Sequence, residues 1–230
     1  MKTIGLIGGM SWESTLEYYR IINEEIRDRR GGDHSGELAI YSFDFNKIVE
    51  FQNQEKWDEL ESMMTEAGKG LKEAGADFLL ICANTMHRRA EDVEESVDLP
   101  LIHIGDAVAE DIKKKGLSSV GLLGTKYVME ADFYREKLKE HGLKTIVPKE
   151  DERAEIHEII YKELCRGVVK QSSKNKILKM IDDLNERGAE GIILGCTELP
   201  IHITEEDVDI PLFDSTRLHA EAAVERALEK

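Results

Sequence analysis

"GADFLLICANT" at residues 75–85 and "GAEGIILGCTE" at residues 188–198 are two copies of one pattern, and they decide the fold. Each copy starts with Gly-Ala, continues as an apolar run and ends in small polar residues. A short apolar run that ends in such a turn is typical of a buried strand in a parallel sheet. Two copies in a chain of 230 residues indicate two related halves.

Two further pairs extend this repeat. "IGLIGG" (4–9) matches "VGLLGT" (120–125), and "VDLPLIH" (97–103) matches "VDIPLFD" (208–214). The three matches keep the same order, at offsets of 116, 113 and 111 residues. We therefore expect two domains, the first made of residues 1–104 plus 210–230 and the second of residues 105–209.

The predicted fold class is α/β, with two pseudo-symmetric, doubly wound parallel-sheet domains and the active site in the cleft between them. Strands are expected at 2–8, 38–43, 77–82, 101–104, 119–123, 144–147, 190–194 and 211–213. Helical periodicity covers 14–29, 56–74, 129–141, 154–167 and 174–187. Ser14 with Glu17 predicts a capping box that opens the first helix.

The turns that follow four of these strands are where a ligand should bind. Ligands of open α/β sheets lie beyond the carboxyl ends of the strands. In this sequence those ends are "GGMSW", "CANTMH", "GTKY" and "GCTELP". The glycines of "GGMSW" lack the spacing of a nucleotide-binding loop and favour a tight turn or a small-anion site.

Charge and composition narrow the partners. A net charge of −16 argues against nucleic acid and anionic membranes, because both require a basic face. No apolar stretch approaches the ~20 residues of a membrane span, and no signal peptide precedes the first strand, so we expect a cytoplasmic location. The expected partner is a small molecule, an amino acid or related carboxylate, and the expected assembly is a homodimer.

The cysteines and histidines were considered as reactive or metal-binding groups. Cys82, Cys165 and Cys196 have no C-x-x-C spacing, which favours reduced thiols. His157 begins like the zinc motif H-E-x-x-H, but Tyr161 stands where the second histidine belongs, so no metal site is predicted. The other histidines are isolated in the sequence and are expected at the surface or in caps.

Cys196 is the candidate reactive thiol. It follows the buried run "IILG" and precedes Thr197, which can cap a following helix. Backbone N–H groups and a helix N-terminus lower a thiol pKa from ~8.5 toward neutrality, where it acts as a general acid or base. A small buried hydrophobic residue is the other reading of a free cysteine.

Three segments, "IGLIGGMSWEST" (4–15), "NTMH" (84–87) and "GCTE" (195–198), together resemble the aspartate/glutamate racemase superfamily, in particular the aspartate racemase-like branch that includes broad-specificity amino-acid racemases. The resemblance covers essentially the whole chain. It implies two α/β domains with the substrate between them. It also implies an isomerase that racemises amino acids without pyridoxal phosphate or any other cofactor. In such enzymes two cysteines, one in C-N-[TS] and one in G-C-T, remove and return the α-proton from opposite faces.

Applied to this sequence, the resemblance makes Cys196 the second-half cysteine and puts Ala83 where the first belongs. The repeat agrees, because its gap-free pairing sets Ala83, and not Cys82, opposite Cys196. Successive strand side chains point to opposite faces, so Cys82 should face into packing and is the weaker catalytic candidate. The second proton carrier stays unassigned.

The resemblance also implies substrate contacts. Asn84, Thr85, Thr125 and Thr197 match positions that hold the substrate carboxylate and amino group, with Met10, Ala83 and Glu198 alongside and Gln52 as a distal group. Family members that bind an acidic substrate often carry a basic side chain near the end of the helix of Tyr161. Here that place is taken by Cys165 or the adjacent Arg166, which leaves the substrate side chain open.

Two other functions fit the same scaffold. One is a malonate-type decarboxylase, as in the related arylmalonate decarboxylases, in which a single cysteine protonates the enolate left by loss of carbon dioxide. The other is a non-catalytic carboxylate-binding homologue. The "GGMSW" and "NTMH" segments favour racemisation.

Overall fold

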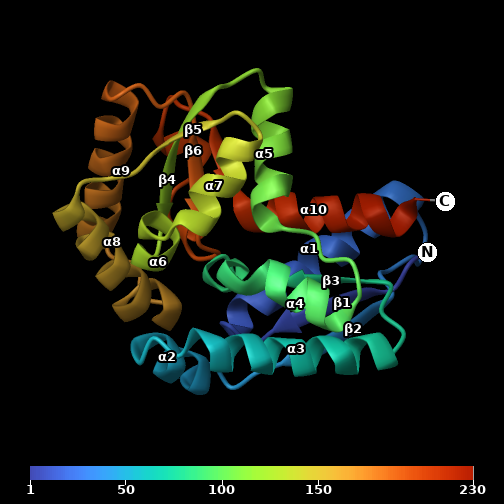
Figure 1. Cartoon of the computed structure of the whole chain (residues 1–230). Helices are drawn as coiled ribbons and strands as arrows, with labels where there is room; N and C mark the ends of the chain where they lie inside the picture. The colour runs from blue at the N-terminus through green and yellow to red at the C-terminus, as the bar shows by residue number, and fades with distance from the viewer. Residues whose placement is uncertain (230) are drawn as a thin grey trace. The chain divides into compact units, whose positions relative to one another are not determined.

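The computed structural model describes residues 1–229 and divides the chain into two compact units (Figure 1). Unit 1 consists of Met1–His103 and His219–Lys230, and unit 2 of Ile104–Leu218. Each unit has its own parallel sheet with helices packed against it.

Unit 1 is built on a three-stranded parallel sheet in the order β2-β1-β3. The strands are β1 (Ile4–Gly8), β2 (Leu38–Ser42) and β3 (Phe78–Ile81). The helices are α1 (Trp12–Arg30), α2 (Phe45–Asn53), α3 (Trp57–Glu73), the 3₁₀ turn η1 (Thr85–Arg89), α4 (Ala90–Val97) and most of α10 (Ser215–Leu228). Helices α1 and α10 share a buried cluster with Leu6 and Leu80, while α3 contacts β1 and α4.

Unit 2 is built on a four-stranded parallel sheet in the order β5-β4-β6-β7. The strands are β4 (Ser119–Gly124), β5 (Lys144–Ile146), β6 (Ile192–Gly195) and β7 (Leu212–Asp214). The helices are α5 (Ile104–Lys114), α6 (Lys126–Glu130), α7 (Asp132–Glu140), α8 (Glu150–Lys162) and α9 (Gln171–Glu186), with 3₁₀ turns η2 (Leu164–Arg166), η3 (Leu199–Ile201) and η4 (Glu205–Asp207). One buried cluster joins Leu194 to α8 and α9, and another joins Leu122 to α5 and α7.

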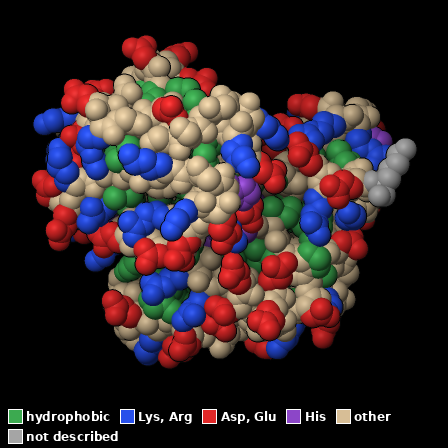
Figure 2. Space-filling model, turned by 45° about the horizontal axis from the view of Figure 1, so that its top comes forward, with side chains coloured by type: hydrophobic (Ala, Val, Ile, Leu, Met, Phe, Trp, Pro, Cys, Tyr) green, Lys and Arg blue, Asp and Glu red, His purple; other side chains and the backbone are tan. Residues whose placement is uncertain are grey.

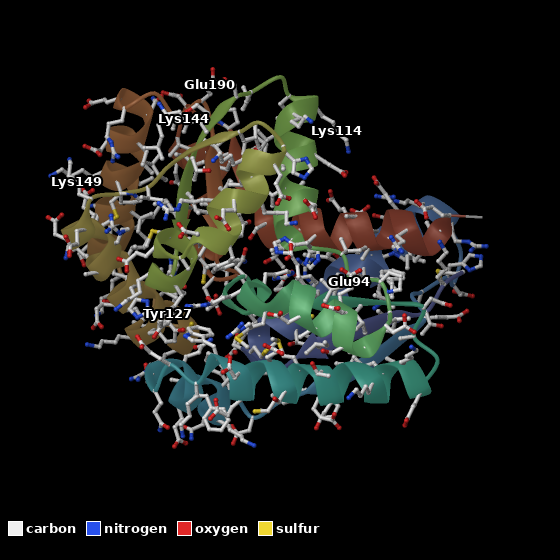
Figure 3. All side chains as sticks on the ribbon, in the orientation of Figure 1. Glu94, Lys114, Tyr127, Lys144, Lys149 and Glu190 are labelled. Carbon is white, nitrogen blue, oxygen red and sulfur yellow. The ribbon has the colours of Figure 1, made fainter. Side chains whose placement is uncertain are left out.

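The start of the second sheet is fastened by a single carboxylate. Glu190 accepts hydrogen bonds from the backbone N–H groups of Ser118 (2.7 Å) and Ser119 (2.9 Å), and it lies beside Lys144 at the top of the view in Figure 3. These two bonds hold the pKa of Glu190 below its usual range. The contact orders the entry into β4 at the end of the sheet opposite to the ligand-binding turns.

The sequence repeat is present in the strand register. The three strands β2-β1-β3 correspond in order to β5-β4-β6. Ile7 pairs with Ile81 in the first sheet, and Leu123 pairs with Leu194 in the second, which are the same pairs at the offsets of the repeat. The α/β class and the two parallel sheets are as predicted.

Three expectations about the fold are wrong. Residues 101–104 form no strand, since Leu101 makes one isolated bridge to Leu79 and α5 begins at Ile104. Residues 210–218 belong to unit 2 and not to the first domain, because β7 pairs with β6 and the chain returns only at His219. Ser14 does not cap α1; the N-cap is Ser11, whose hydroxyl accepts the Ser14 N–H at 3.2 Å.

The surface mixes charges of both signs. On the face shown in Figure 2, acidic and basic side chains alternate over most of the area. Among the described residues, no helix has both the length and the apolar character that crossing a membrane requires.

Candidate active site

The turn after β1 is locked by hydrogen bonds from the first turn of α1. The Thr15 hydroxyl accepts the Gly9 N–H at 2.8 Å and donates to the Ser11 carbonyl at 3.1 Å. Gly9 has a φ of 78°, a conformation that disfavours any residue with a Cβ. The Gly9 N–H is therefore engaged within the protein, and the turn positions the buried side chain of Met10 instead.

The turn after β3 is fixed through two carbonyl groups. The Ser14 hydroxyl donates to the Cys82 carbonyl at 2.7 Å, and the ring Nδ1 of His87 donates to the Ala83 carbonyl at 2.9 Å. Both donors are buried, so they hold the backbone on either side of Ala83. The spacing of four residues between Ala83 and His87 was the sequence signal for this clamp.

Cys82 and Ala83 differ sharply in environment. Cys82 is 0% exposed and packs in the same cluster as Phe78 and Leu80, whose side chains share its strand parity. Burial raises the pKa of the Cys82 thiol, so it stays protonated at neutral pH. Ala83 has the opposite parity and is partly exposed. By the register of the repeat, Ala83 corresponds to Cys196 and Cys82 to Gly195.

The other first-half residues predicted for the site gather in buried positions around this turn. Asn84 and Thr85 follow Ala83 directly and are buried at the start of η1. Gln52 comes from the end of α2, and its amide donates to the Met86 sulfur at 3.4 Å. This contact ties α2 to η1 and places Gln52 in unit 1 with the residues after β3.

Behind the turn lies a histidine cluster made of His87, His103 and His219, with Tyr18 at its edge. The His87 ring lies 4.8 Å from His103 and 5.2 Å from His219, measured between centroids. His219 accepts from the Tyr18 hydroxyl (2.8 Å) and donates to the Ile102 carbonyl (2.8 Å). Burial lowers the pKa of His87 to about 4 and that of His219 well below its ordinary value. The expectation that these histidines are surface or cap residues is wrong, because three distant segments converge here.

In unit 2 the central group is Cys196, which follows β6. Its Sγ donates a hydrogen bond to Oε2 of Glu198 at 2.9 Å, and both side chains are buried. The thiol is 9% exposed, whereas Cys82 is fully enclosed. The pattern "C-T-E", with a carboxylate two residues after the thiol, was visible in the sequence, but the pairing of the two groups was not inferred from it.

The expected lowering of the Cys196 pKa is contradicted. Burial, and then the negative charge of Glu198, raise the pKa of the thiol well above its ordinary value. The segment that follows is only the three-residue turn η3, capped by Glu198 rather than Thr197, so no long helix offers its N-terminus to the sulfur. In the empty site Cys196 is a neutral thiol that donates to a carboxylate.

A wall of aromatic and sulfur side chains lies near Cys196. Tyr161 of α8 is largely buried, which raises its pKa, and the charges of Cys196 and Glu198 act in the same direction. The His157 ring lies 4.7 Å from Tyr161 and 5.6 Å from Tyr127, the α6 residue labelled in Figure 3. Burial and nearby Lys126 lower the His157 pKa, so this wall is neutral at pH 7. The sequence gave no signal that these rings meet.

The remaining second-half residues lie on the same strand-end turns. Thr125 caps α6, and its Oγ1 accepts the Val128 N–H at 3.3 Å. Thr197 is partly exposed beside Cys196. Cys165 packs at the edge of the cluster that contains Cys196. Across residues 1–229, no three His, Cys, Asp or Glu side chains converge as metal ligands would.

Comparison with known proteins gives a consistent family. The model of the family described as Asp/Glu/Hydantoin racemase matches residues 7–223. A broad-specificity amino-acid racemase of Bacillus subtilis is 22% identical over 233 residues, which covers 96% of each chain.

Two solved structures are similar along the full length. A putative Asp/Glu racemase from Yersinia pestis is 43% identical, with a TM-score of 0.94 and 100% of both chains covered. An aspartate racemase homologue from Pyrococcus horikoshii is 43% identical, with a TM-score of 0.87 and the same coverage.

Proposed function

Because this chain belongs to the Asp/Glu/Hydantoin racemase family and is an isomerase of the racemase type, we propose that it racemises or epimerises an amino acid without a cofactor, with Cys196 as the acid/base group. The observation that carries this proposal is the hydrogen bond between the Cys196 thiol and the Glu198 carboxylate, 2.9 Å long, directly after a central strand. A thiol next to a fixed proton acceptor is a group that can both give and take a proton.

The raised thiol pKa defines the order of events. In the empty site Cys196 carries its proton. The ammonium group of a bound amino acid adds positive charge, which favours the thiolate, and Glu198 is positioned to accept the thiol proton. The thiolate then removes the α-proton and returns it, or the thiol delivers one to a carbanion formed from the other side. Both steps use the same sulfur.

Substrate binding is assigned to polar groups of the strand-end turns. Asn84, Thr85 and Thr125, with Thr197, would hold the carboxylate and the ammonium group. Donors directed at the carboxylate also stabilise the negative charge that grows there as the α-proton leaves. Met10 and Gln52 would contact the rest of the amino acid, and Glu198 would face the ammonium group.

Ala83 makes the proposed chemistry unequal on its two faces. It corresponds to Cys196 in the register of the repeat, but a methyl group carries no proton. Cys82 is enclosed in the core and does not replace it. The second proton would then come from water or from a hydroxyl such as that of Thr85. We expect the enzyme to exchange the α-proton of one enantiomer faster than it inverts that enantiomer.

The test is a panel of D- and L-amino acids incubated with the enzyme in deuterated water, with α-deuteration and inversion read separately. Cys196→Ser should lose at least ~10²-fold in exchange, while Cys82→Ser should keep its rate per folded molecule. Glu198→Gln removes a charge that disfavours the thiolate, so exchange should begin at lower pH. A Cys196→Ser variant with more than a tenth of the wild-type exchange rate would exclude the mechanism.

A second function, decarboxylation of a malonate-type acid, is favoured by one observation. Of the two strand-end positions related by the repeat, only Cys196 carries a thiol, and one thiol suffices to protonate an enolate. Release of carbon dioxide from substituted malonates, with no α-proton exchange in any amino acid, would select this function. No exchange, no decarboxylation and calorimetric binding of an amino acid would select a binding protein.

We also infer a cytoplasmic location for this activity. The mechanism requires Cys196 as a free thiol, and all three cysteines are free in the structure. Reducing compartments maintain that state.

A further inference from the structure

The outer face of α1 carries a row of large apolar side chains. Trp12, Leu16 and Tyr19 follow one another at helical spacing and are 62%, 52% and 47% exposed. The inner face of the same helix buries Tyr18, Ile22 and other residues in the unit 1 core, so the outer row plays no part in folding that core. Together the three side chains expose on the order of 300 Å² of apolar surface, as large as the main patch of a typical monomer.

Asn23 and Arg27 continue this row toward the C-terminal end of α1, and here the surface is hollow. The cavity has a volume of about 580 Å³ and lies between the second half of α1 and the loop 32–35. The Asn23 side chain accepts the Gly36 N–H at 2.9 Å, which fastens the loop to the helix and keeps the hollow open. One helix therefore presents both a projecting aromatic row and a recess.

The row is symmetric about Tyr19. Trp12 lies seven residues before it and Arg27 eight residues after it, while Leu16 and Asn23 lie three before and four after. If a second α1 crosses antiparallel at Tyr19, Trp12 of each copy meets Arg27 and the hollow of the other, and Leu16 meets Asn23. An indole against a guanidinium is a favourable pair. A two-fold axis at Tyr19 satisfies both ends of the row at once.

The charges along α1 fit the same arrangement. Glu13 and Glu17 are the charged residues of its first two turns, whereas all four arginines, Arg20, Arg27, Arg29 and Arg30, lie in its second half. In an antiparallel pair the acidic half of each helix faces the basic half of the other. A parallel pair would instead place like charges together.

We propose that this α1 face, formed by Trp12, Leu16, Tyr19, Asn23 and Arg27, is the interface of a homodimer in which two α1 helices cross antiparallel at Tyr19. The nearby strand β2 agrees with a covered surface, because it is an edge strand with Ile40 and Tyr41 exposed and no charged residue. Edge strands of this kind are normally shielded. Trp12 lies two residues from Met10, so the interface also borders the proposed substrate turn.

Cross-linking tests the axis directly. In Tyr19→Cys two thiols meet at the two-fold axis, so mild oxidation should give a disulfide-linked dimer on a non-reducing gel. Asp28→Cys is the matched control, because its side chain is 70% exposed on the opposite side of α1. Equal linking of the two variants, or none in Tyr19→Cys, would overturn the proposal.

Mass measurement in solution tests the face. The wild type should have twice the chain mass of 26.1 kDa by light scattering at tens of micromolar, and Leu16→Glu should weaken the dimer at least ~10-fold with unchanged circular dichroism. Glu13→Arg and Arg27→Glu should each weaken it, and the double variant should recover it. A monomeric wild type, or a Leu16→Glu variant as dimeric as the wild type, contradicts the assignment.

Discussion

Acid should destabilise this protein through His87, and the structure gives the size of the effect. His87 is fully buried between the rings of His103 and His219, with Tyr18 bonded to the latter. Burial lowers its pKa from 6.5 to about 4 in the folded chain. The unfolded chain therefore binds the proton more tightly than the folded chain.

The sign and window follow from these two values. Between pH 6.5 and pH 4 the unfolded state holds more protons at this residue, so stability rises with pH across that interval. The contribution is complete above pH 6.5 and is lost as pH falls through 4. Relative to pH 7, His87 alone should remove about 2 kcal/mol at pH 5 and about 3 kcal/mol at pH 4. His219 shifts in the same direction and adds to the loss.

The assay is urea unfolding followed by circular dichroism at a series of pH values for the wild type and for His87→Gln. Glutamine keeps an N–H donor for the Ala83 carbonyl but does not titrate. The variant should be less stable at pH 7, and its free energy of unfolding should fall less steeply from pH 6.5 to 4. Identical slopes for the two proteins would show that His87 is not held neutral by burial, and the reasoning would fail.

Three further variants test separate parts of the structure. Cys82→Ser should lose ~1 to 3 kcal/mol of stability by burying a hydroxyl, and should keep its turnover per folded molecule; normal stability with lost turnover would make Cys82 catalytic. Ala83→Cys should raise the ratio of inversion to exchange, measured for both enantiomers; an unchanged ratio with normal binding would refute the correspondence with Cys196. Gly8→Ala should cost ~1 to 3 kcal/mol, because its Cβ would meet Thr15 at 2.6 Å, whereas Gly70→Ala on open α3 surface should be neutral or stabilising; equal effects would refute the steric argument.

The strands were predictable from sequence because their apolar runs are distinctive and each is followed by a turn. The register of the repeat could even be read without a structure, since gap-free pairing of 75–85 with 188–198 is what the two sheets show. The error at 210–218 has a physical cause. A three-residue strand such as β7 gains its identity from pairing with β6, and no local pattern reveals which sheet it joins. The bridge at Leu101 is the reduced counterpart of that strand in unit 1.

The site was only half predictable. Residues that carry the chemistry, such as Cys196 and Ala83, stand in motifs that the sequence shows directly. Their environments depend on residues brought from elsewhere, and Tyr161 and His157 reach the Cys196 turn only through the packing of α8. The thiol pKa failed for this reason. A strand-end cysteine was expected to meet a helix N-terminus, but the chain supplies a three-residue turn and a carboxylate instead.

That carboxylate also bears on the choice between the two proposed reactions. Glu198 lies beside the thiol among neutral side chains, so the unit 2 part of the site favours a ligand that brings positive charge. An amino acid has an ammonium group to place there, and the same group favours the thiolate that racemisation needs. A malonate has two carboxylates and no cation, so one of its negative charges would face Glu198 without compensation. Decarboxylation would need only a neutral Cys196 thiol as proton donor, which Glu198 helps to maintain, but binding of the dianion would oppose the same carboxylate. The position of Glu198 therefore weighs toward a zwitterionic substrate, and the conserved acidity of the thiol proton becomes a property of the bound complex rather than of the empty enzyme.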